Sequence, residues 1–251
     1  MTGLLAAIDA HPHDPGITGI VINALGKLAA NAENHRVLVE AGVVKAALRC
    51  CEKFDALGDA RFAEGFAALI LPLSFDQELV RTVLGPAGAA RAVIKIAKNF
   101  GNHSTTVAGS PMSWPPPNVP THNAAMAALA STFDGPDAEE RAKSLPRIAQ
   151  TCAQVLANLA CDNEMGDDGK SSVDVLVDAG AIAVLADLIV AHPENPRLLE
   201  DCICGLSNMA YVSEDIQLQI GRSSMRGIAG ACARALKLSD ACVQCVLFSA
   251  V

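Results

Sequence analysis

A short phrase that recurs along the chain constrains the fold more than any other feature. The segments HRVLVEAG (35–42), RTVLGPAG (81–88) and VDVLVDAG (173–180) each contain Val-Leu-x-x-Ala-Gly and precede an apolar stretch. Gly88 follows Gly42 by 46 residues, Gly180 follows Gly88 by 92, and a further turn is expected at Gly221, 41 residues later. A helical period of roughly 40–47 residues is typical of stacked repeats, which bury their apolar faces against neighbouring units. The pattern predicts an all-α solenoid.

The glycine of each phrase is expected to end a short helix. The residue after a helix C-terminus often takes a left-handed backbone conformation, which glycine adopts without a Cβ clash. Apolar residues at i, i+3 and i+4 follow each glycine and predict a second helix with one buried face. A second phrase recurs as Ala24–Ala29 (ALGKLA), Val155–Ala160 (VLANLA) and Gly205–Ala210 (GLSNMA).

A long helix ending in the second phrase, a short helix ending in Val-Asp-Ala-Gly and an apolar helix together resemble the armadillo repeat. The resemblance is best over 146–221 and looser over 16–100. It implies three helices per repeat in a right-handed α-solenoid. The first helices are then expected at about 32–41, 76–84, 172–179 and 214–220, the second at about 2–10, 43–54, 89–100, 181–191 and 224–237, and the third at about 16–31, 60–74, 146–160, 196–212 and from Asp240 onward.

The middle of the chain departs from this pattern. The segment after Phe100 holds Pro115, Pro116 and Pro117 and cannot be helical there. Helices are expected at 123–133 and, as a short charged helix, at 137–144, so that 101–145 is a degenerate repeat. The expectation is one domain over 1–251 with five to six repeats. Because its last stretch ends on apolar residues, it is expected to belong to a longer solenoid or to be covered by a partner.

Composition restricts the classes of partner and the cellular location that the chain is expected to have. The net charge is −8 and no Lys/Arg run is present, which argues against duplex nucleic acid. The most apolar helix, around 181–191, is too short to span a bilayer, so no membrane insertion is expected. The odd number of cysteines among apolar residues fits reduced thiols and a cytoplasmic location, with nucleus or cilium as alternatives.

The resemblance also implies a groove along the third helices that holds an extended segment of a partner. The matching positions are Lys27, Asn158 and Asn208, with Asn23, Gln154 and Cys204 one turn earlier. An asparagine amide both donates and accepts, so it can hold an extended backbone. The alternative, weighted equally, is that Asn158 and Asn208 hold the neighbouring repeat. The tryptophans that pair with such asparagines in nuclear-import members are absent.

Other candidate sites are weaker. Trp114 lies in the proline-rich loop 110–120 and is a possible contact for a proline-binding domain, although a loop packed on a helix is favoured. The acidic loop 162–169 lacks the spacing of a calcium loop, and the cysteine pairs lack four convergent zinc ligands. No catalytic motif is found, and no cofactor or metal is expected.

The sequence therefore favours a non-enzymatic intracellular scaffold or adaptor that binds an extended segment or helix of another protein. The alternative is an architectural subunit of a large cytoskeletal or ciliary assembly, in which the outer and end surfaces matter as much as the groove.

Overall fold

The chain is all-α in the part that the structure describes. The computed structural model describes residues 2–11, 14–53, 60–86, 88–100, 137–161 and 171–222, and within these ranges it contains helices and no β-strand. The helices are α1 Thr2–Ala10, α2 Pro15–Ala29, η1 Ala32–Asn34, α3 His35–Glu40, α4 Val43–Lys53, α5 Ala60–Ser74, α6 Gln77–Leu79, η2 Val80–Leu84, α7 Ala89–Phe100, α9 Asp137–Leu159, α10 Ser172–Asp178, α11 Ala181–Ala191 and α12 Pro196–Ala210, followed by a helical segment over 214–222.

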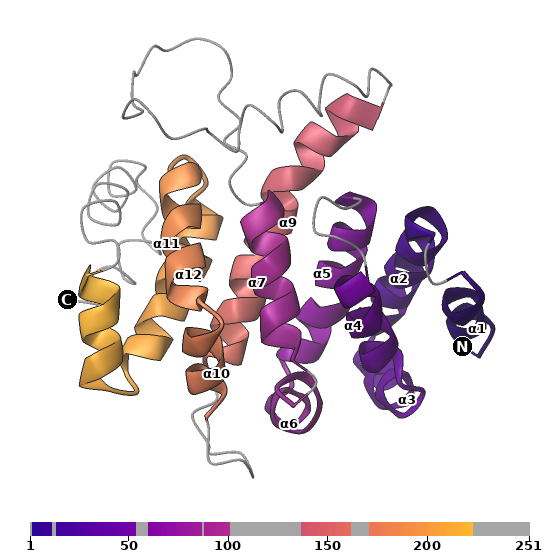
Figure 1. Cartoon of the computed structure of the whole chain (residues 1–251), viewed down its shortest axis with the longest axis horizontal. Coiled ribbons are helices and arrows are strands. Elements are labelled where there is room, and N and C mark those ends of the chain that lie inside the picture. The colour runs from indigo at the N-terminus through magenta and orange to yellow at the C-terminus, as the bar shows by residue number, and fades with distance from the viewer. Residues whose placement is uncertain are drawn as a thin grey trace.

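The long helices pack in chain order. Helix α2 packs on α5, α5 on α9 and α9 on α12, while the shorter helices α4, α7 and α11 contact one another in the same order. The described helices run from α1 at one end of the view to the 214–222 segment at the other (Figure 1). Side chains that are 50 to 85 positions apart in sequence therefore meet on neighbouring long helices.

The recurring glycines do what the sequence predicts. Gly42, Gly88 and Gly180 have φ values of 77°, 80° and 89°, in the left-handed region that favours glycine. Each lies between a short helix and the mid-length helix that follows. The turn expected at Gly221 is wrong, because Gly221 lies inside the helical segment 214–222.

Side-chain caps fix where two of the long helices, α2 and α12, begin. Asp14 Oδ1 accepts the amide of Ile17 at 3.0 Å, and Asn195 Oδ1 accepts the amide of Leu198 at 3.2 Å. A proline follows each cap at the first helical position, where its missing N–H costs nothing. The same cap-then-proline pattern therefore starts α2 and α12.

One boundary differs from the sequence prediction. The expected short helix at 137–144 and third helix at 146–160 form one continuous helix, α9, which passes through Pro146. A proline within a helix removes one hydrogen bond and crowds the preceding turn. From Ile148 onward α9 is packed between α5, α7 and α12, and this tertiary packing outweighs the local penalty. The helices expected at 123–133, at 224–237 and from Asp240 lie outside the described residues.

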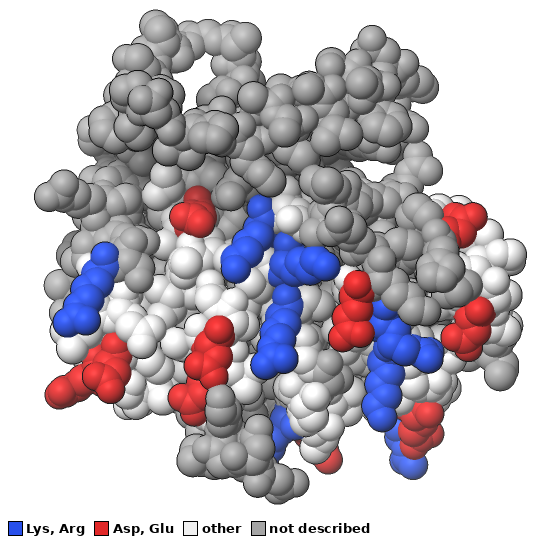
Figure 2. Space-filling model, viewed as in Figure 1, with Lys and Arg blue, Asp and Glu red and all other residues white. Residues whose placement is uncertain are grey.

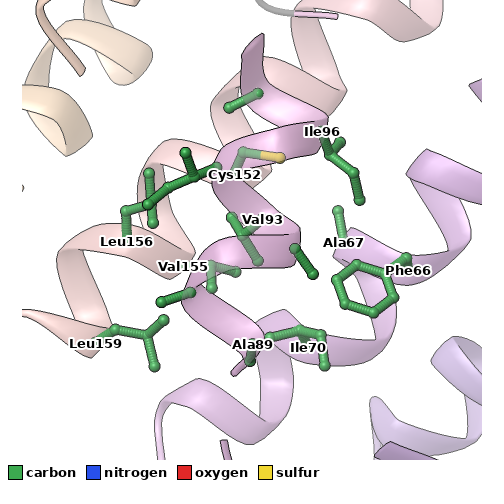
Figure 3. Packing of buried hydrophobic residues seen from close by; sticks show 14 of the residues in the cluster. Phe66, Ala67, Ile70, Ala89, Val93, Ile96, Cys152, Val155, Leu156 and Leu159 are labelled. Carbon is green, nitrogen blue, oxygen red and sulfur yellow. The ribbon is translucent and has the colours of Figure 1, made fainter. Parts of the chain in front are cut away.

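The core lies between the long helices and α7. Side chains from α5, α7 and α9 point toward one another (Figure 3) and are fully or almost fully buried: Phe66, Ala67, Ile70, Ala89, Val93, Ile96, Cys152, Val155, Leu156 and Leu159. Burial of this kind stabilises by about 25 cal/mol per Å² of apolar surface. It is also what holds α9 against α5 and α7.

Small residues let the long helices approach closely. A Cβ added to Gly65 on α5 would lie 2.9 Å from the backbone nitrogen of Asn23 on α2. At the contact between α12 and α9, a Cβ added to Gly205 would lie 3.3 Å from Cα of Ala157. The backbones of neighbouring long helices thus nearly touch, which sets the spacing of the polar residues that lie on them.

Candidate functional site

The six positions predicted for the groove lie on three of the four packed long helices, and we call them the ladder residues: Asn23 and Lys27 on α2, Gln154 and Asn158 on α9, and Cys204 and Asn208 on α12. Lys27 is exposed and the other five are half-buried. The structure brings the α9 and α12 pairs onto adjacent helices and places α5 between them and the α2 pair. Trp114, the remaining predicted contact, lies outside the described residues.

Asn158 joins α9 to α5. Its Nδ2 donates to the Ser74 hydroxyl at 2.9 Å, and that hydroxyl donates its own proton to the Leu71 carbonyl at 2.7 Å. Since Ser74 has only one proton to give, it must accept from Asn158, and this fixes the orientation of the amide. Oδ1 of Asn158 is then the remaining acceptor, and it receives no hydrogen bond from the residues that the structure describes.

Asn208 makes the equivalent connection from α12 to α9. Its Nδ2 donates to the Ala157 carbonyl at 3.3 Å and approaches the Cys161 sulfur at 3.1 Å. A carbonyl can only accept, so this amide is also oriented with its nitrogen toward the neighbouring helix. Within the described part of the chain, Oδ1 of Asn208 has no donor either. Both asparagines hold the preceding long helix with one end of the amide and leave the other as an acceptor.

Helix α5 interrupts the row of polar ladder residues. Aligning Ser74 with the last alanine of the second phrase, Ala160, puts Pro72 at the position of Asn158 and Ala68 at the position of Gln154. Pro72 has no side-chain polar group and no backbone N–H. Lys27 on α2 is therefore separated from the two asparagines by a helix without an equivalent amide.

Sequence reasoning missed Ser74, the partner of Asn158. Ser74 occupies the position that alanine takes at or directly after the end of the other long helices, as Ala29, Ala160 and Ala210. It is fully buried and its hydroxyl is satisfied on both sides. A serine where its repeat equivalents are alanine was the signal that could have identified it.

Two thiols lie against Asn208, and an acidic residue lies further back on α12. Its Nδ2 is 3.8 Å from the Cys204 sulfur, in addition to its contact with Cys161. Burial raises the pKa of both thiols, and the Asn208 amide opposes the rise by donating to sulfur. One turn before Cys204, burial and then the neighbouring Glu200 raise the pKa of Asp201 to about 7. The Asp201 carboxyl group is therefore largely protonated below neutral pH.

Two kinds of feature are absent from the described residues. No cluster of three or more His, Cys, Asp or Glu side chains in them is placed to hold a metal ion. Nor is any of the described helices both long enough and apolar enough to cross a bilayer.

Comparison with known proteins assigns no family. No protein-family model matches the chain, and no curated protein matches it. Among solved structures, the chain is similar to an engineered protein whose crystal structure was determined by the Northeast Structural Genomics Consortium, with 18% identity and a TM-score of 0.49 over 100% of this chain and 97% of that one.

Proposed function

We propose that this chain is a non-enzymatic protein-binding scaffold with an armadillo-type solenoid, whose long helices hold an extended segment of a partner. The repeated order of short helix, left-handed glycine, mid-length helix and long helix supports this architecture. So does the packing of α2, α5, α9 and α12 in chain order. In this arrangement α6, η2, α7 and α9 belong to one repeat, because α7 packs directly on α9.

The observation that carries the function is the orientation of two side-chain amides. Asn158 and Asn208 each turn Nδ2 toward the preceding long helix and keep Oδ1 as an acceptor without a donor in the described residues. An extended peptide lying across α9 and α12 would present backbone N–H groups to those oxygens, as an added strand does. The two amides are already held in place, so ordering these side chains adds little to the entropy cost of binding a peptide.

Affinity purification with chemical cross-linking tests this proposal. Partners cross-linked to α9 and α12 of the wild type are identified, and their affinity is measured for the variant N158A/N208A. Each lost hydrogen bond is worth about 1 kcal/mol, so roughly a tenfold or greater loss of affinity is expected.

The control separates partner binding from helix packing. Ser74→Ala removes the internal partner of Asn158 but keeps its Oδ1. We expect this variant to retain the cross-linked partner. If Ser74→Ala loses the partner as fully as N158A/N208A does, the asparagines act only by holding the helices together, and the proposed binding mode is wrong.

A further inference from the structure

The outer face of α7 is entirely cationic. Of the residues of α7, only Arg91, Lys95 and Lys98 are exposed, and the remainder are buried or half-buried. They follow one another at i, i+4 and i+7 and therefore share one face of the helix. Figure 2 shows Lys and Arg side chains, in blue, gathered over α7 in the middle of the viewed face. We call this set the α7 strip.

Comparison between repeats shows that the scaffold does not require these charges. The α7 strip lies three, seven and ten residues after the turn glycine Gly88. The same positions after Gly42 and Gly180 are also exposed, so all three helices present equivalent faces to solvent. On α4 these positions are Lys45, Arg49 and Glu52, and on α11 they are Ala183, Asp187 and Val190. Positive charge is thus concentrated on α7 and at Lys45 and Arg49 of α4.

The α7 strip has one acidic neighbour but no ion pair among the described residues: burial raises the pKa of Asp187 on α11, and the charge of Lys98 opposes that rise. In the described part of the chain, no carboxylate lies within ion-pair distance of Arg91, Lys95 or Lys98. Like charges at this spacing on a helix repel one another and mildly destabilise the helix. The chain as a whole has a net charge of −8, so this cluster of one sign is contrary to the overall balance.

A shallow hollow adjoins the charges. It has a volume of about 300 Å³ and is lined by Arg91, Ile94, Lys95, Lys98, Asn99 and Ala179. Ile94 and Ala179 give it an apolar floor beside the α10–α11 turn, and the stems of the lysines add apolar walls. One aliphatic side chain could rest there while acidic neighbours face the cations.

We propose that the α7 strip, extended by Lys45 on α4, binds an acidic peptide segment of a partner protein that places an apolar side chain in the hollow. Charge complementarity identifies this partner, and the hollow favours a peptide over a plain polyanion. The strip is only about 10 Å long, the rise of seven helical residues. A nucleic acid engages many successive phosphates for its affinity, and this length offers few. The surface lies on helices other than those of the ladder residues.

A direct binding assay tests the proposal. A fluorescein-labelled peptide of alternating glutamate and aspartate with one central leucine is titrated with the full chain, and fluorescence anisotropy is recorded. Lys95→Gln with Lys98→Gln should weaken binding by about tenfold, and raising the salt concentration should weaken the wild-type complex, since the contacts are exposed charge pairs. Replacing the central leucine by serine should also weaken it.

Two matched controls decide the outcome. The variant R197Q/R222Q removes the same charge from exposed arginines at α12 and the 214–222 segment and should leave binding unchanged. The variant N158A/N208A should also bind the peptide normally, so failure of the groove proposal is distinguishable from failure of this one. Equal loss in R197Q/R222Q, or no loss in K95Q/K98Q, overturns the proposal.

Two other classes of anion are tested as alternative ligands of the α7 strip. A single-stranded oligonucleotide and vesicles containing phosphatidylserine are tested on the same variants. If either binds through Lys95 and Lys98 more tightly than the peptide does, the surface recognises nucleic acid or lipid and the peptide proposal is wrong.

Discussion

Asn158 on α9 donates to the Ser74 hydroxyl on α5 at 2.9 Å, across 84 positions of sequence. Ser74 is fully buried, and its own proton goes to the Leu71 carbonyl of the same helix. The contact therefore satisfies a buried hydroxyl and orients an amide at the same time. A single polar pair couples the packing of two long helices to the proposed binding surface.

The first prediction concerns this pair. Asn158→Ala and Ser74→Ala should each destabilise the fold, and the double variant should cost less than the sum, with a coupling of about 1 kcal/mol. Urea unfolding of the four proteins followed by circular dichroism gives the coupling free energy. Additive effects would show that the two side chains do not share a hydrogen bond in solution.

The second prediction concerns the contact between α2 and α5. Gly65→Ala should destabilise the fold by about 1–3 kcal/mol, because the new Cβ would lie 2.9 Å from the Asn23 backbone nitrogen, which cannot move alone. Gly3→Ala on α1 is the control, since its Cβ would meet nothing within 4 Å. Thermal unfolding compares the two. A Gly65→Ala protein as stable as the control would mean that the helices are further apart than the structure has them.

Much of the fold was predictable because the same helix pattern recurs, so each repeat supports the helix bounds assigned to the others. The bounds expected at 89–100 and 181–191 match α7 and α11, as the positive φ of Gly88 and Gly180 requires. The continuous α9 was not predictable, because Pro146 is a local signal for a break and the packing that overrides it comes from α5 and α12. The turn predicted at Gly221 is wrong because a glycine at the expected period does not by itself form a turn.

The site was predictable only in part. Recurrence identified Asn158 and Asn208, but spacing along one helix cannot say which atom of an amide faces the neighbouring helix. That depends on Ser74 and on the Ala157 carbonyl, which belong to other helices. The α7 strip was hidden because lysines and arginines spaced by three or four residues do not form a run in the sequence.

The third prediction concerns pH and Asp201. Burial, followed by the charge of Glu200, raises its pKa to about 7 in the folded state, above the ordinary value of 3.8. A raised carboxyl pKa means that the folded state holds the proton more tightly, so the associated stability is full below about pH 4 and is lost as pH rises through 7. Asp201→Asn should therefore be more stable than the wild type at pH 8. After discounting for solvent at this half-buried side chain, the gain is on the order of 1 kcal/mol.

Urea unfolding at pH 5 and pH 8 checks the prediction for Asp201. The difference in unfolding free energy between wild type and Asp201→Asn should be small at pH 5 and larger at pH 8. Glu52→Gln removes the same charge from an exposed position on α4 and controls for net charge. A gain for Asp201→Asn that is the same at both pH values would contradict the assigned cause.

The last prediction concerns the reactivity of Cys161. This thiol is exposed, donates to the Ala157 carbonyl at 3.4 Å and accepts from Asn208 Nδ2 at 3.1 Å. Cys152, by contrast, is fully buried, and burial raises its pKa to about 12. Of these two, iodoacetamide at pH 8 should modify Cys161 first, because alkylation needs an accessible thiolate.

The Asn208 amide lowers the pKa of the Cys161 thiol, so Asn208→Ala should move the midpoint of the alkylation–pH profile upward. Peptide mass spectrometry over a pH series separates this shift from a change in access, which would alter the limiting rate at high pH instead. Ser74→Ala, which leaves the Asn208 contacts intact, should keep the wild-type midpoint, and an unchanged midpoint in Asn208→Ala would rule out the amide as the stabilising donor.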